Sequence, residues 1–392
     1  MNIAIVTSGI LPVPPSKGGA VENLVKLYLD YNERQNVNIQ FTVYSVSDKS
    51  ISDSELLKYR KTKYVFINTE TFISKIKKIL FRYTNRNLYY HYSWEFFSSE
   101  VAHKIKKGKF DFVVVENRPG FALRLSKITD AKLILHLHND MLNKDTKSAS
   151  EILNLYTKVL AVSKYIKERV DTIMSTAKVQ VVYNGIDLEK FKNPFHLEIN
   201  RKSFHLSEDD FVVIYTGRIE PVKGVKELLN AFSLLIDYEK IKLLIVGGGN
   251  GNINEGDFFS EMHGLASLMP EKVIFTGFQS YDKVPAILHL CDVAVVPSIW
   301  EEPLSLTSLE DMAIGLPLVV TRSGGIPEVV NEECAIFVDI DNNLPLNLSN
   351  AILSLYRDES KRSRMSLCAK ERSALFDKEK YAVDFLKYIS EH

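Results

Sequence analysis

Hydrophobic residues along the chain fall into short uninterrupted runs, separated by stretches with helical spacing. Runs of this kind, rich in Val and Ile, predict strands that are buried on both faces. In the first half of the chain the predicted strands are Ile3–Thr7, Ile39–Val46, Phe110–Val115, Lys132–Leu137, Lys158–Val162 and Val179–Val182. In the second half they are Phe211–Tyr215, Lys242–Val246, Val273–Phe275, Val293–Val296, Leu318–Val320 and Ala335–Val338.

The alternation of strands and helices predicts an α/β protein with two parallel sheets, each covered by helices on both sides. Two series of this kind indicate two Rossmann-like domains. The pattern is interrupted within Asp187–Arg201, so we assign residues 1–190 to the first domain and 191–374 to the second. The remaining residues, 375–392, contain the amphipathic helical pattern Lys378–Ile389. We expect this helix to pack back on a domain and assign it to the N-terminal one.

The composition limits the possible functions. The chain has 392 residues, enough for two domains, and 45% of them are hydrophobic, which is ordinary for a globular protein. Lys and Arg together number 49, as do Asp and Glu, so no overall positive charge favours nucleic acid as a partner. The three cysteines are far apart in the chain, form no disulfide or zinc pattern, and fit a reducing cytoplasm. The N-terminal residues predict a strand and not a signal peptide, and no apolar run is long enough to span a bilayer.

The segment Ser298–Glu310 carries two carboxylates, Glu302 and Glu310, with small hydroxyl residues between them and a predicted helix that runs to Gly315. A carboxylate just before a helix accepts hydrogen bonds from sugar hydroxyls, and the free N–H groups of the helix start hold phosphate. One segment can therefore bind both ends of a sugar nucleotide. Two alternatives remain: Thr307 and Glu310 have the spacing of a capping box, and Glu302 near a helix start stabilises the helix dipole without a ligand. A hydrolytic carboxylate pair fits poorly, because Glu310 would lie inside the helix.

Two further loops follow predicted strands. Gly18-Gly19 precedes the helical pattern Ala20–Tyr31, where glycines let a ligand approach the backbone and the helix start favours an anion. A plain strand-to-helix turn is the equal alternative. Arg218 and Lys223 flank a proline-bearing loop after the first strand of the second domain, and their side chains suit the oxygens of a diphosphate. The alternative is two solvated cations, but ligands of such sheets bind at the carboxyl ends of strands, which favours binding.

Gly247–Gly251 also follows a strand and is similar to a dinucleotide-binding turn, but Asn252 occupies the place of the third glycine. It predicts either a nucleobase pocket that includes Gly248 or a flexible loop. His136 and His138 end a strand and point to the same side, because side chains alternate along a strand. For His138 we favour a hydrogen bond to a sugar hydroxyl or proton transfer, whereas a structural role is an equal alternative for His136.

Two other patterns point to partners. Asp339-Ile340-Asp341 matches a short metal-binding pattern, D-x-D, but its place after a strand and before Asn342-Asn343 predicts a turn, and we assign no metal. The segment Phe72–Phe97 mixes basic and aromatic residues, which suits the interface of an anionic membrane. The alternative is two ordinary helices that use their aromatic side chains in the core.

Taken together and in this order, the motifs resemble the retaining GT-B glycosyltransferases of glycosyltransferase family four, the group 1 type of bacterial polysaccharide synthesis. The resemblance covers nearly the whole chain. Each motif is weak alone and the ordered set is specific: Gly18-Gly19, His138, Val162-Ser163, Tyr183–Asp187, Gly217-Arg218, Lys223-Gly224, Glu302 with Glu310, and Gly324–Glu328.

The resemblance implies a GT-B fold, in which an acceptor-binding domain and a domain that binds a nucleotide-sugar donor face each other across a cleft. It also implies transfer with retention at the anomeric carbon, without a divalent metal or another cofactor, in which a leaving phosphate oxygen takes the acceptor's proton. Carried over position by position, the resemblance implies that Arg218 and Lys223 bind the diphosphate, Glu302 the sugar hydroxyls and Glu310 the ribose. It also implies that Gly18 and Gly19 border the diphosphate from the N-terminal domain and that His138 contacts the reacting sugar.

The segment after Glu302 departs from the family pattern. After Glu302 the family has Pro-Phe-Gly, whereas this chain has Pro303-Leu304-Ser305. Backbone N–H donors at Leu304, Ser305 and Leu306 are kept, but serine lacks the freedom in φ that glycine has. The preference for a donor sugar therefore stays open.

These observations predict a glycosyltransferase that moves a sugar from a nucleotide-sugar donor, expected to be UDP-linked, to a glycan or lipid-linked saccharide of bacterial surface polysaccharide. We expect it in the cytoplasm, peripheral at the inner face of the cell membrane through residues 72–97. Two alternatives from other classes remain. One is a non-catalytic glycan-binding or partner subunit that has kept the fold, and the other is a nicotinamide-dependent oxidoreductase, suggested by Gly247–Gly251.

Overall fold

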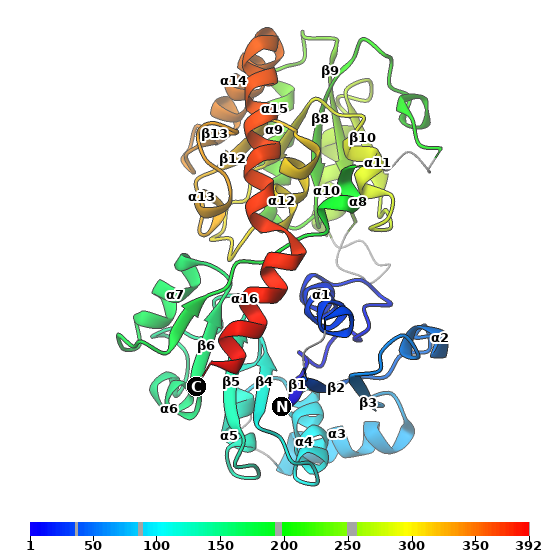
Figure 1. Ribbon diagram of the computed structural model, residues 1–392. Helices are drawn as coiled ribbons and strands as arrows, with labels where there is room; N and C mark the ends of the chain where they lie inside the picture. The colour runs from blue at the N-terminus through cyan, green and yellow to red at the C-terminus, as the bar shows by residue number, and fades with distance from the viewer. Residues whose placement is uncertain (36–37, 85–88, 193–197, 249–256, 392) are drawn as a thin grey trace. The chain divides into compact units, whose positions relative to one another are not determined.

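A computed structural model describes residues 1–35, 38–84, 89–192, 198–248 and 257–391 (Figure 1). The chain divides into two compact units. Unit 1 contains Met1–Gly185 and Lys378–His392, and unit 2 contains Ile186–Asp377. These divisions lie a few residues from the domain borders predicted after residues 190 and 374.

Unit 1 is built on a parallel sheet of seven strands in the order β3-β2-β1-β4-β5-β6-β7. Strand β1 lies in the middle, where Ile3 pairs with Phe41 of β2 on one side and with Phe112 of β4 on the other. The strands are β1 (Asn2–Val6), β2 (Gln40–Val46), β3 (Thr62–Ile67), β4 (Phe112–Glu116), β5 (Lys132–Leu137), β6 (Lys158–Ala161) and β7 (Val179–Val181).

Unit 2 contains a second parallel sheet, of six strands in the order β10-β9-β8-β11-β12-β13. Its core is lined by aliphatic residues from the strands and from the helices that cover them. The strands are β8 (Phe211–Thr216), β9 (Ile241–Val246), β10 (Val273–Gly277), β11 (Val293–Val296), β12 (Leu318–Thr321) and β13 (Ala335–Val338).

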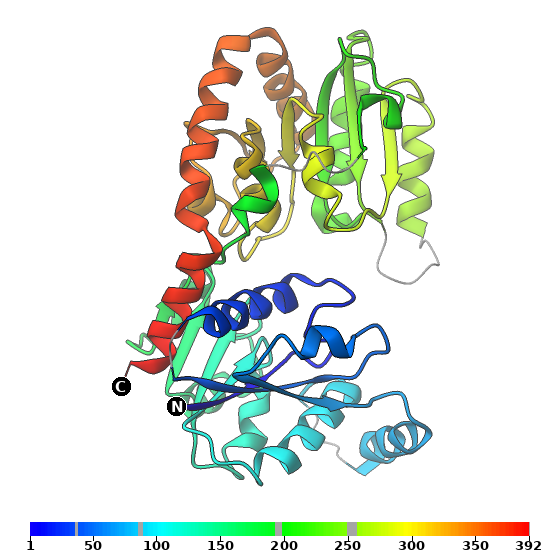
Figure 2. The same ribbon diagram turned by 45° about the vertical axis from the view of Figure 1, so that its right-hand side comes forward.

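Helices cover both sheets (Figure 1, Figure 2). Those of unit 1 are α1 (Ala20–Arg34), α2 (Asp53–Leu56), α3 (Phe72–Thr84), α4 (Tyr92–Ile105), α5 (Ala122–Leu125), α6 (Ala149–Leu155), α7 (Lys164–Asp171) and α16 (Lys378–Ser390). Those of unit 2 are α8 (Leu188–Lys192), α9 (Val225–Ser233), α10 (Asp257–Ala266), α11 (Val284–Leu288), α12 (Leu306–Ile314), α13 (Ile326–Val329), α14 (Leu344–Arg357) and α15 (Glu359–Ser373). Short 3₁₀ turns are η1 (Pro119–Phe121), η2 (Arg201–Phe204), η3 (Pro221–Lys223) and η4 (Ala374–Phe376).

The last helix of the chain, α16, packs against the first, α1. The rings of Tyr28 and Phe385 stack with centroids 4.0 Å apart, and Arg34 forms an ion pair with Glu379 at 2.6 Å. Tyr28 and Phe385 are fully buried, so their contact contributes both apolar area and ring stacking to unit 1. The helical pattern predicted for Lys378–Ile389 is confirmed.

The strand predictions are confirmed for all the predicted segments, with ends that shift by at most two residues. Strand β3 was missed. It lies at the edge of its sheet, and its side chains are only partly buried, as at Lys63. An edge strand keeps polar positions, so it lacks the continuous hydrophobic run that marks a central parallel strand.

In both sheets the strand order reverses direction next to the first strand of the unit. In unit 1 this happens between β1 and β4, and in unit 2 between β8 and β11. Loops that leave two such strands diverge to opposite sides, which opens a crevice at their carboxyl ends. Lys223 and Glu302 lie in the loops that follow β8 and β11, and Gly18 and Gly19 lie between β1 and α1.

Candidate functional site

Adjacent strands bring two distant loops of unit 2 together. Strands β8 and β11 pair in parallel, so the loop after β8, with Arg218 and Lys223, lies beside the loop after β11. The two loops are joined by a backbone hydrogen bond from the Ile299 N–H to the Val222 carbonyl, at 3.0 Å. The cations and carboxylates predicted from separate segments therefore meet at one edge of the sheet.

Glu302 is the centre of this cluster. Its Oε1 accepts hydrogen bonds from the Lys223 ammonium at 2.5 Å and from the Ser298 hydroxyl at 2.6 Å. The side chains of Lys223 and Glu302 are only 18% and 9% exposed, so their charges interact with little screening by water. Among the described residues, none donates a hydrogen bond to the second oxygen, Oε2, which leaves that oxygen able to accept one from a ligand.

The indole ring of Trp300 lies under the Lys223 ammonium. The nitrogen is 5.1 Å from the ring centroid, within range of a cation–π contact. An ammonium has three N–H donors, and Glu302 takes one of them. Lys223 therefore keeps donors for a second anionic ligand while Trp300 and Glu302 hold it in place.

The backbone around Glu302 is held by the loop after β12. The Gly325 N–H donates to the Glu302 carbonyl at 2.6 Å, and the Glu302 N–H donates to the Ser323 hydroxyl at 3.4 Å. Gly324 has φ of +49°, and a Cβ there would lie 2.2 Å from the Glu302 carbonyl oxygen. Only glycine fits this position, which explains why the Gly324–Glu328 motif accompanies Glu302.

Helix α12 begins at Leu306, four residues beyond Glu302. Its N-cap is Ser305, whose hydroxyl accepts a hydrogen bond from the Ser308 N–H at 3.2 Å. The capping box considered for Thr307 and Glu310 is wrong, because Thr307 already lies inside the helix. Ser305 has φ of −83°, an ordinary value for serine, so the loss of the family's glycine causes no strain here.

Glu310 lies inside α12, as predicted, but it is not part of the Glu302 cluster. Burial raises the pKa of Glu310 to about 7, and the Tyr281 hydroxyl, which donates to its carboxyl group, opposes that shift. The Lys190 ammonium lies 4.2 Å from the centroid of the Tyr281 ring. Glu310 therefore lies in a separate, buried environment beside Tyr281 and Lys190, where its pKa is about 7.

The remaining predicted donor contacts of unit 2 differ in exposure. Arg218 is exposed, with 60% of its side chain accessible, and pairs with Glu220 at 2.8 Å. Gly248 lies next to it, since its carbonyl accepts from the Ile219 N–H at 3.0 Å. Leu304 is buried and Leu306 is half-buried. Of the glycine-rich loop, Gly249, Asn250, Gly251 and Asn252 lie outside the described residues.

In unit 1 the predicted glycines meet an acidic side chain. Gly18 and Gly19 have φ of +73° and +103°, and Gly19 is the N-cap of α1. A Cβ on Gly19 would lie 2.3 Å from Oε2 of Glu22, which is buried against the helix start. Burial raises the pKa of Glu22 to about 7, against the opposing effect of hydrogen bonds from its own backbone N–H and from the Ser8 hydroxyl. Contact between these glycines and a diphosphate stays a prediction.

His138 and His136 share one buried carboxylate, Glu116. Oε2 of Glu116 lies 2.9 Å from Nε2 of His138 and 3.0 Å from Nδ1 of His136, and its Oε1 accepts from the Tyr28 hydroxyl at 3.0 Å. The prediction that the two histidines point the same way is confirmed. Burial and the neighbouring His136 lower the pKa of His138 to about 4, so its ring is neutral at neutral pH. The carboxylate is ionised, because the two imidazoles hold the pKa of Glu116 near 2 despite its burial.

The same three residues are the metal-ligand cluster found within the described parts of the chain. One ligand atom from each of Glu116, His136 and His138 lies within 4.8 Å of the others. Two imidazoles and a carboxylate suit a transition metal. The carboxylate oxygen is already within hydrogen-bonding distance of both rings, so a metal would compete with these contacts. Asp339-Ile340-Asp341 behaves as the turn predicted, with the Asp341 carboxylate accepting from the Asn343 N–H at 2.8 Å.

The sequence did not single out several residues of these clusters. Ser298 and Trp300 touch the Lys223–Glu302 pair, Tyr281 contacts Glu310, and Glu116 joins the histidines. Glu116 could have been found by the same reasoning as His138, because it also lies at the end of a buried strand. Where β4 and β5 pair, Glu116 lies opposite His136. Arg118, which follows, is buried and stacks on Trp94 with its guanidinium carbon 4.1 Å from the ring centroid.

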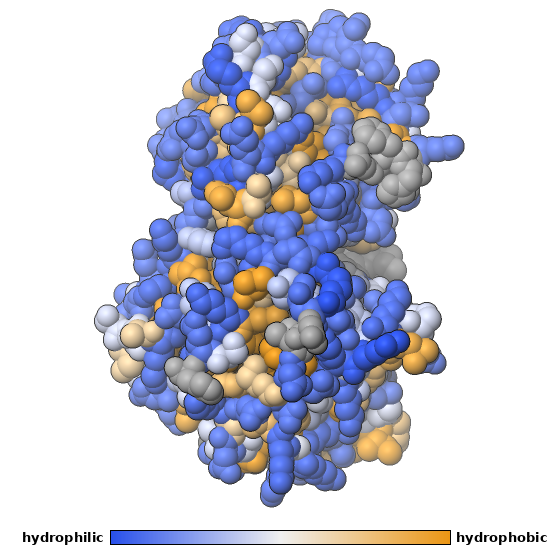
Figure 3. Space-filling view, viewed as in Figure 1, coloured by the Kyte–Doolittle hydropathy of each residue, from blue (hydrophilic) through white to orange (hydrophobic). Residues whose placement is uncertain are grey.

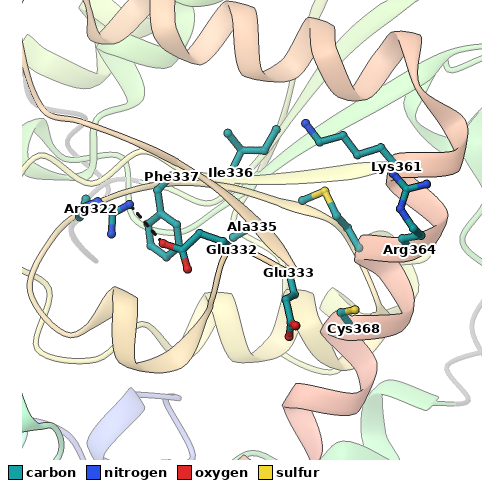
Figure 4. A pocket seen from close by; sticks show the side chains of 10 residues that line it. Arg322, Glu332, Glu333, Ala335, Ile336, Phe337, Lys361, Arg364 and Cys368 are labelled. Carbon is teal, nitrogen blue, oxygen red and sulfur yellow. Dashed lines mark ion pairs between the residues drawn. The ribbon is translucent and has the colours of Figure 1, made fainter.

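Two cavities within the described residues lie away from these clusters. One, of about 550 Å³, is bordered by β13 and α15, and Arg322 and Glu332 at its rim form an ion pair at 3.6 Å (Figure 4). A second, of about 490 Å³, lies in unit 1 beside Thr42 and Lys107. None of the predicted site residues lines either of these two cavities.

Two family models match the chain. The model described as Glycosyltransferase Family 4 matches residues 61–190, in unit 1, with a short extension into unit 2. The model described as Glycosyl transferases group 1 matches residues 197–372, within unit 2. The second match contains the Lys223–Glu302 cluster and α12, and the first contains the Glu116–His138 cluster.

Known proteins resemble the chain over much of its length. A putative glycosyltransferase, YtcC, of Bacillus subtilis is 27% identical over 392 residues, which are 96% of this chain and 88% of that protein. A lipopolysaccharide 1,2-N-acetylglucosaminetransferase of Salmonella typhimurium is 28% identical over 253 residues, 64% of this chain and 63% of that protein. The crystal structure of HepE of Anabaena in complex with UDP and glucose aligns over 100% of both chains with a TM-score of 0.76 and 20% identity. With the family matches and two parallel-sheet units of the expected kind, the chain belongs to the group 1 glycosyltransferases of family four and has the GT-B fold.

Proposed function

We propose that this glycosyltransferase takes a sugar from a nucleotide-sugar donor, UDP-linked, and transfers it with retention to a glycan or lipid-linked saccharide of the bacterial surface. The observation that carries the proposal is the contact of Lys223 and Ser298 with one oxygen of Glu302 beside the start of α12. Two relatives support the choice of substrates: HepE was crystallised with UDP and glucose, and the Salmonella protein is named for lipopolysaccharide.

The cluster suits the two ends of such a donor. Oε2 of Glu302 accepts hydrogen bonds from sugar hydroxyls. The remaining N–H donors of Lys223, together with the exposed guanidinium of Arg218, bind the diphosphate. The first N–H groups of α12, at Leu306 and Thr307, precede the first intrahelical hydrogen bonds and add further donors for an anion.

The reaction breaks the bond between the anomeric carbon and a diphosphate oxygen and forms a bond from that carbon to an acceptor oxygen. The acceptor hydroxyl loses its proton to the departing diphosphate oxygen, so charge and atoms balance. Negative charge grows on the diphosphate in the transition state, where Lys223, Arg218 and the α12 N–H groups stabilise it. These groups perform the neutralisation that a divalent metal performs in other transferases.

The acceptor is bound by unit 1, at the carboxyl ends of β1, β4 and β5, beside Gly19 at the diphosphate and His138 at the reacting sugar. The neutral His138 ring suits a hydrogen bond to a sugar hydroxyl more than it suits transfer of a proton at neutral pH, because burial favours the neutral form. We place the protein at the cytoplasmic face of the cell membrane, where lipid-linked saccharides are extended.

A donor panel tests the proposal. UDP, GDP and dTDP sugars are each incubated with the protein, and binding is followed by titration calorimetry and hydrolysis by release of the nucleotide. Lys223→Met should weaken nucleotide binding by about tenfold to a hundredfold, since a charge-assisted contact is lost. Lys226→Met is the matched control, because Lys226 is exposed nearby and pairs with Glu261 at 2.7 Å. Glu302→Gln should leave UDP binding close to wild type and lower hydrolysis of the UDP-sugar.

Three outcomes separate the candidate functions. Binding of no nucleotide at millimolar concentration rejects the donor site. Binding of a GDP or dTDP sugar in place of a UDP sugar would support the transferase function and show that the predicted nucleotide base is wrong. A normal cellular glycan in strains that carry Glu302→Ala or Lys223→Met, combined with loss of the glycan on deletion, establishes the non-catalytic subunit instead.

A further inference from the structure

Helix α3 exposes large hydrophobic side chains that no described residue covers. In two views it lies at the periphery of unit 1 (Figure 1, Figure 2), and hydrophobic atoms appear at the lower right of the space-filling view, where Figure 1 places α3 (Figure 3). The exposed fractions are 78% for Phe72, 67% for Ile73, 43% for Ile76, 56% for Ile79, 57% for Leu80 and 70% for Tyr83. A surface that carries six such residues on one helix needs an explanation, because contiguous apolar patches mark interaction sites.

These side chains share one side of the helix. With about 100° of rotation per residue, Phe72, Ile76, Ile79 and Tyr83 fall within one narrow arc, and Ile73 and Leu80 extend it. The opposite side is the one that packs on the protein. Ser74 there is buried, and α3 is in contact with α4 along this side. The apolar side of α3 therefore points away from the core of unit 1.

Cations border the apolar side on both edges. Lys75 and Lys77 lie on either flank, and both are exposed. Arg82 adds a further exposed positive charge, and the thirteen residues of α3 include no Asp or Glu. Lys78 lies on the packing side, where it is 14% exposed and pairs with Glu70 at 3.7 Å. Lys77 is 54% exposed and reaches Glu100 of α4 only at 3.3 Å, a pair that water and salt weaken.

We propose that α3 lies flat on an anionic lipid bilayer, with the apolar side inserted among the acyl chains and the flanking cations at the phosphate groups. Hydrophobic insertion and attraction to anionic headgroups add, which is the physical basis of binding by interfacial helices. A protein partner with an acidic rim is the competing occupant, but the two charged edges and the unbroken apolar side between them match a planar lipid surface. The use of this contact, to bring unit 1 to a lipid-linked acceptor, rests on the proposed function; the contact itself does not.

The proposed membrane contact involves a shorter segment than residues 72–97, which were predicted from the sequence. Of the described residues in Phe72–Phe97, only those of α3 form a free apolar side. Phe96 and Phe97 of α4 are buried in unit 1, and Trp94 stacks on the guanidinium of Arg118. The alternative, in which the aromatic side chains of the segment pack in the core, therefore holds for α4 and not for the exposed side of α3. No helix within the described residues is long and apolar enough to cross a membrane, so α3 is expected to lie on the bilayer.

Flotation with lipid vesicles tests the inference. The full-length protein is mixed with phosphatidylcholine vesicles that contain either no phosphatidylglycerol or about 30% of it, near the anionic content of many membranes. The protein should float with the anionic vesicles only, and high salt should release part of it because exposed charges are screened. Ile76→Gln with Leu80→Gln should lower the partition coefficient about tenfold or more, since two buried aliphatic groups are lost. Glutamine keeps the helix propensity.

Matched variants complete the design. Leu57→Gln is the apolar control, because Leu57 is 80% exposed in unit 1 outside α3. Lys75→Gln with Lys77→Gln should weaken anionic binding, and Lys127→Gln is its control. Binding that survives the α3 variants, or that is equal for neutral and anionic vesicles, overturns the proposal. The proposal is also overturned if the protein binds no vesicles and the Ile76→Gln/Leu80→Gln variant is a monomer where the wild-type protein is a dimer. In that case a second copy of the chain would cover the apolar side of α3. Donor hydrolysis in solution should be equal in all variants. Hydrolysis therefore tests the proposed function, whereas vesicle binding tests the membrane contact.

Discussion

The ammonium of Lys223 lies 2.5 Å from Oε1 of Glu302, although 79 residues separate the two positions in the chain. Both side chains are largely buried, so each charge depends on the other for its solvation. The pair exists because β8 and β11 are neighbours in the sheet, and the loop after each strand supplies one partner. The diphosphate contact that we propose for Lys223 would therefore lie next to the carboxylate that we propose for the sugar.

The Lys223–Glu302 pair should show strong energetic coupling. We expect Lys223→Met to lower the free energy of unfolding by about 2 kcal/mol, because Glu302 keeps a buried charge without its partner. The double variant with Glu302→Gln should lose less than the sum of the two single losses. Urea unfolding in a Trp94→Phe background reports on unit 2 through Trp300, since the chain has two tryptophans. A coupling energy of zero would show that the pair is not formed in solution.

Glu310 should make unit 2 less stable at high pH. The pKa of Glu310 is about 7 in the folded protein and 4.5 in the unfolded chain, so the folded state holds the proton more tightly. The stabilising effect is complete below pH 4.5 and is lost as the pH rises through 7. Glu310→Gln should raise the free energy of unfolding at pH 8 by up to about 3 kcal/mol and change it little at pH 4. Urea titrations at the two pH values test this, with the exposed Glu271→Gln as control; equal effects at both would contradict it.

Glu116 should control the titration of His138. Replacing it by Gln removes the negative charge that raises the pKa of His138, so this pKa should fall further below its value of about 4. The buried ring also loses a charged acceptor, which should cost about 2 kcal/mol of stability at pH 7. NMR titration of the imidazole resonances checks the first effect. An unchanged pKa of His138 in Glu116→Gln would show that burial and not the carboxylate sets the balance.

Gly324 should be required for the position of Glu302. An alanine Cβ at φ of +49° would lie 2.2 Å from the Glu302 carbonyl oxygen, so the loop must move. The left-handed backbone alone costs an L-residue about 1–2 kcal/mol. Gly324→Ala should therefore destabilise unit 2 and weaken donor hydrolysis. Gly264→Ala in α10 is the matched control: no atom lies within 4 Å of its Cβ, and alanine should stabilise the helix by about 1 kcal/mol.

Removal of divalent metal should leave transfer unchanged. We expect Lys223, Arg218 and the first N–H groups of α12 to neutralise the diphosphate, so EDTA should not lower the rate of donor hydrolysis. The rate is measured after dialysis against EDTA and again after addition of Mg²⁺, Mn²⁺ or Zn²⁺. A loss of about tenfold or more that one of these ions restores would assign a metal to the reaction, with the Glu116–His138 cluster as the first place to look.

The sequence predicted the elements better than their contacts. Buried parallel strands leave continuous apolar runs, so the predicted strands and the helix from Lys378 agree with the structure. The edge strand β3 escaped because its positions are half-buried. The capping box at Thr307 was wrong because several hydroxyl residues in a row offer alternative caps, and only the backbone conformation of Ser305 selects one.

The sequence by itself determined the α/β alternation, the residues that end each strand, and the order of motifs that identifies the family. These depend on local periodicity and on residue type. Only the tertiary structure decided that Ser298 and Trp300 join Lys223 and Glu302, and that Glu310 stands apart with Tyr281. It also decided that the aromatic residues of α4 face the core while the apolar side of α3 does not. Periodicity tells which side of a helix is hydrophobic, but strand order and packing determine what that side meets.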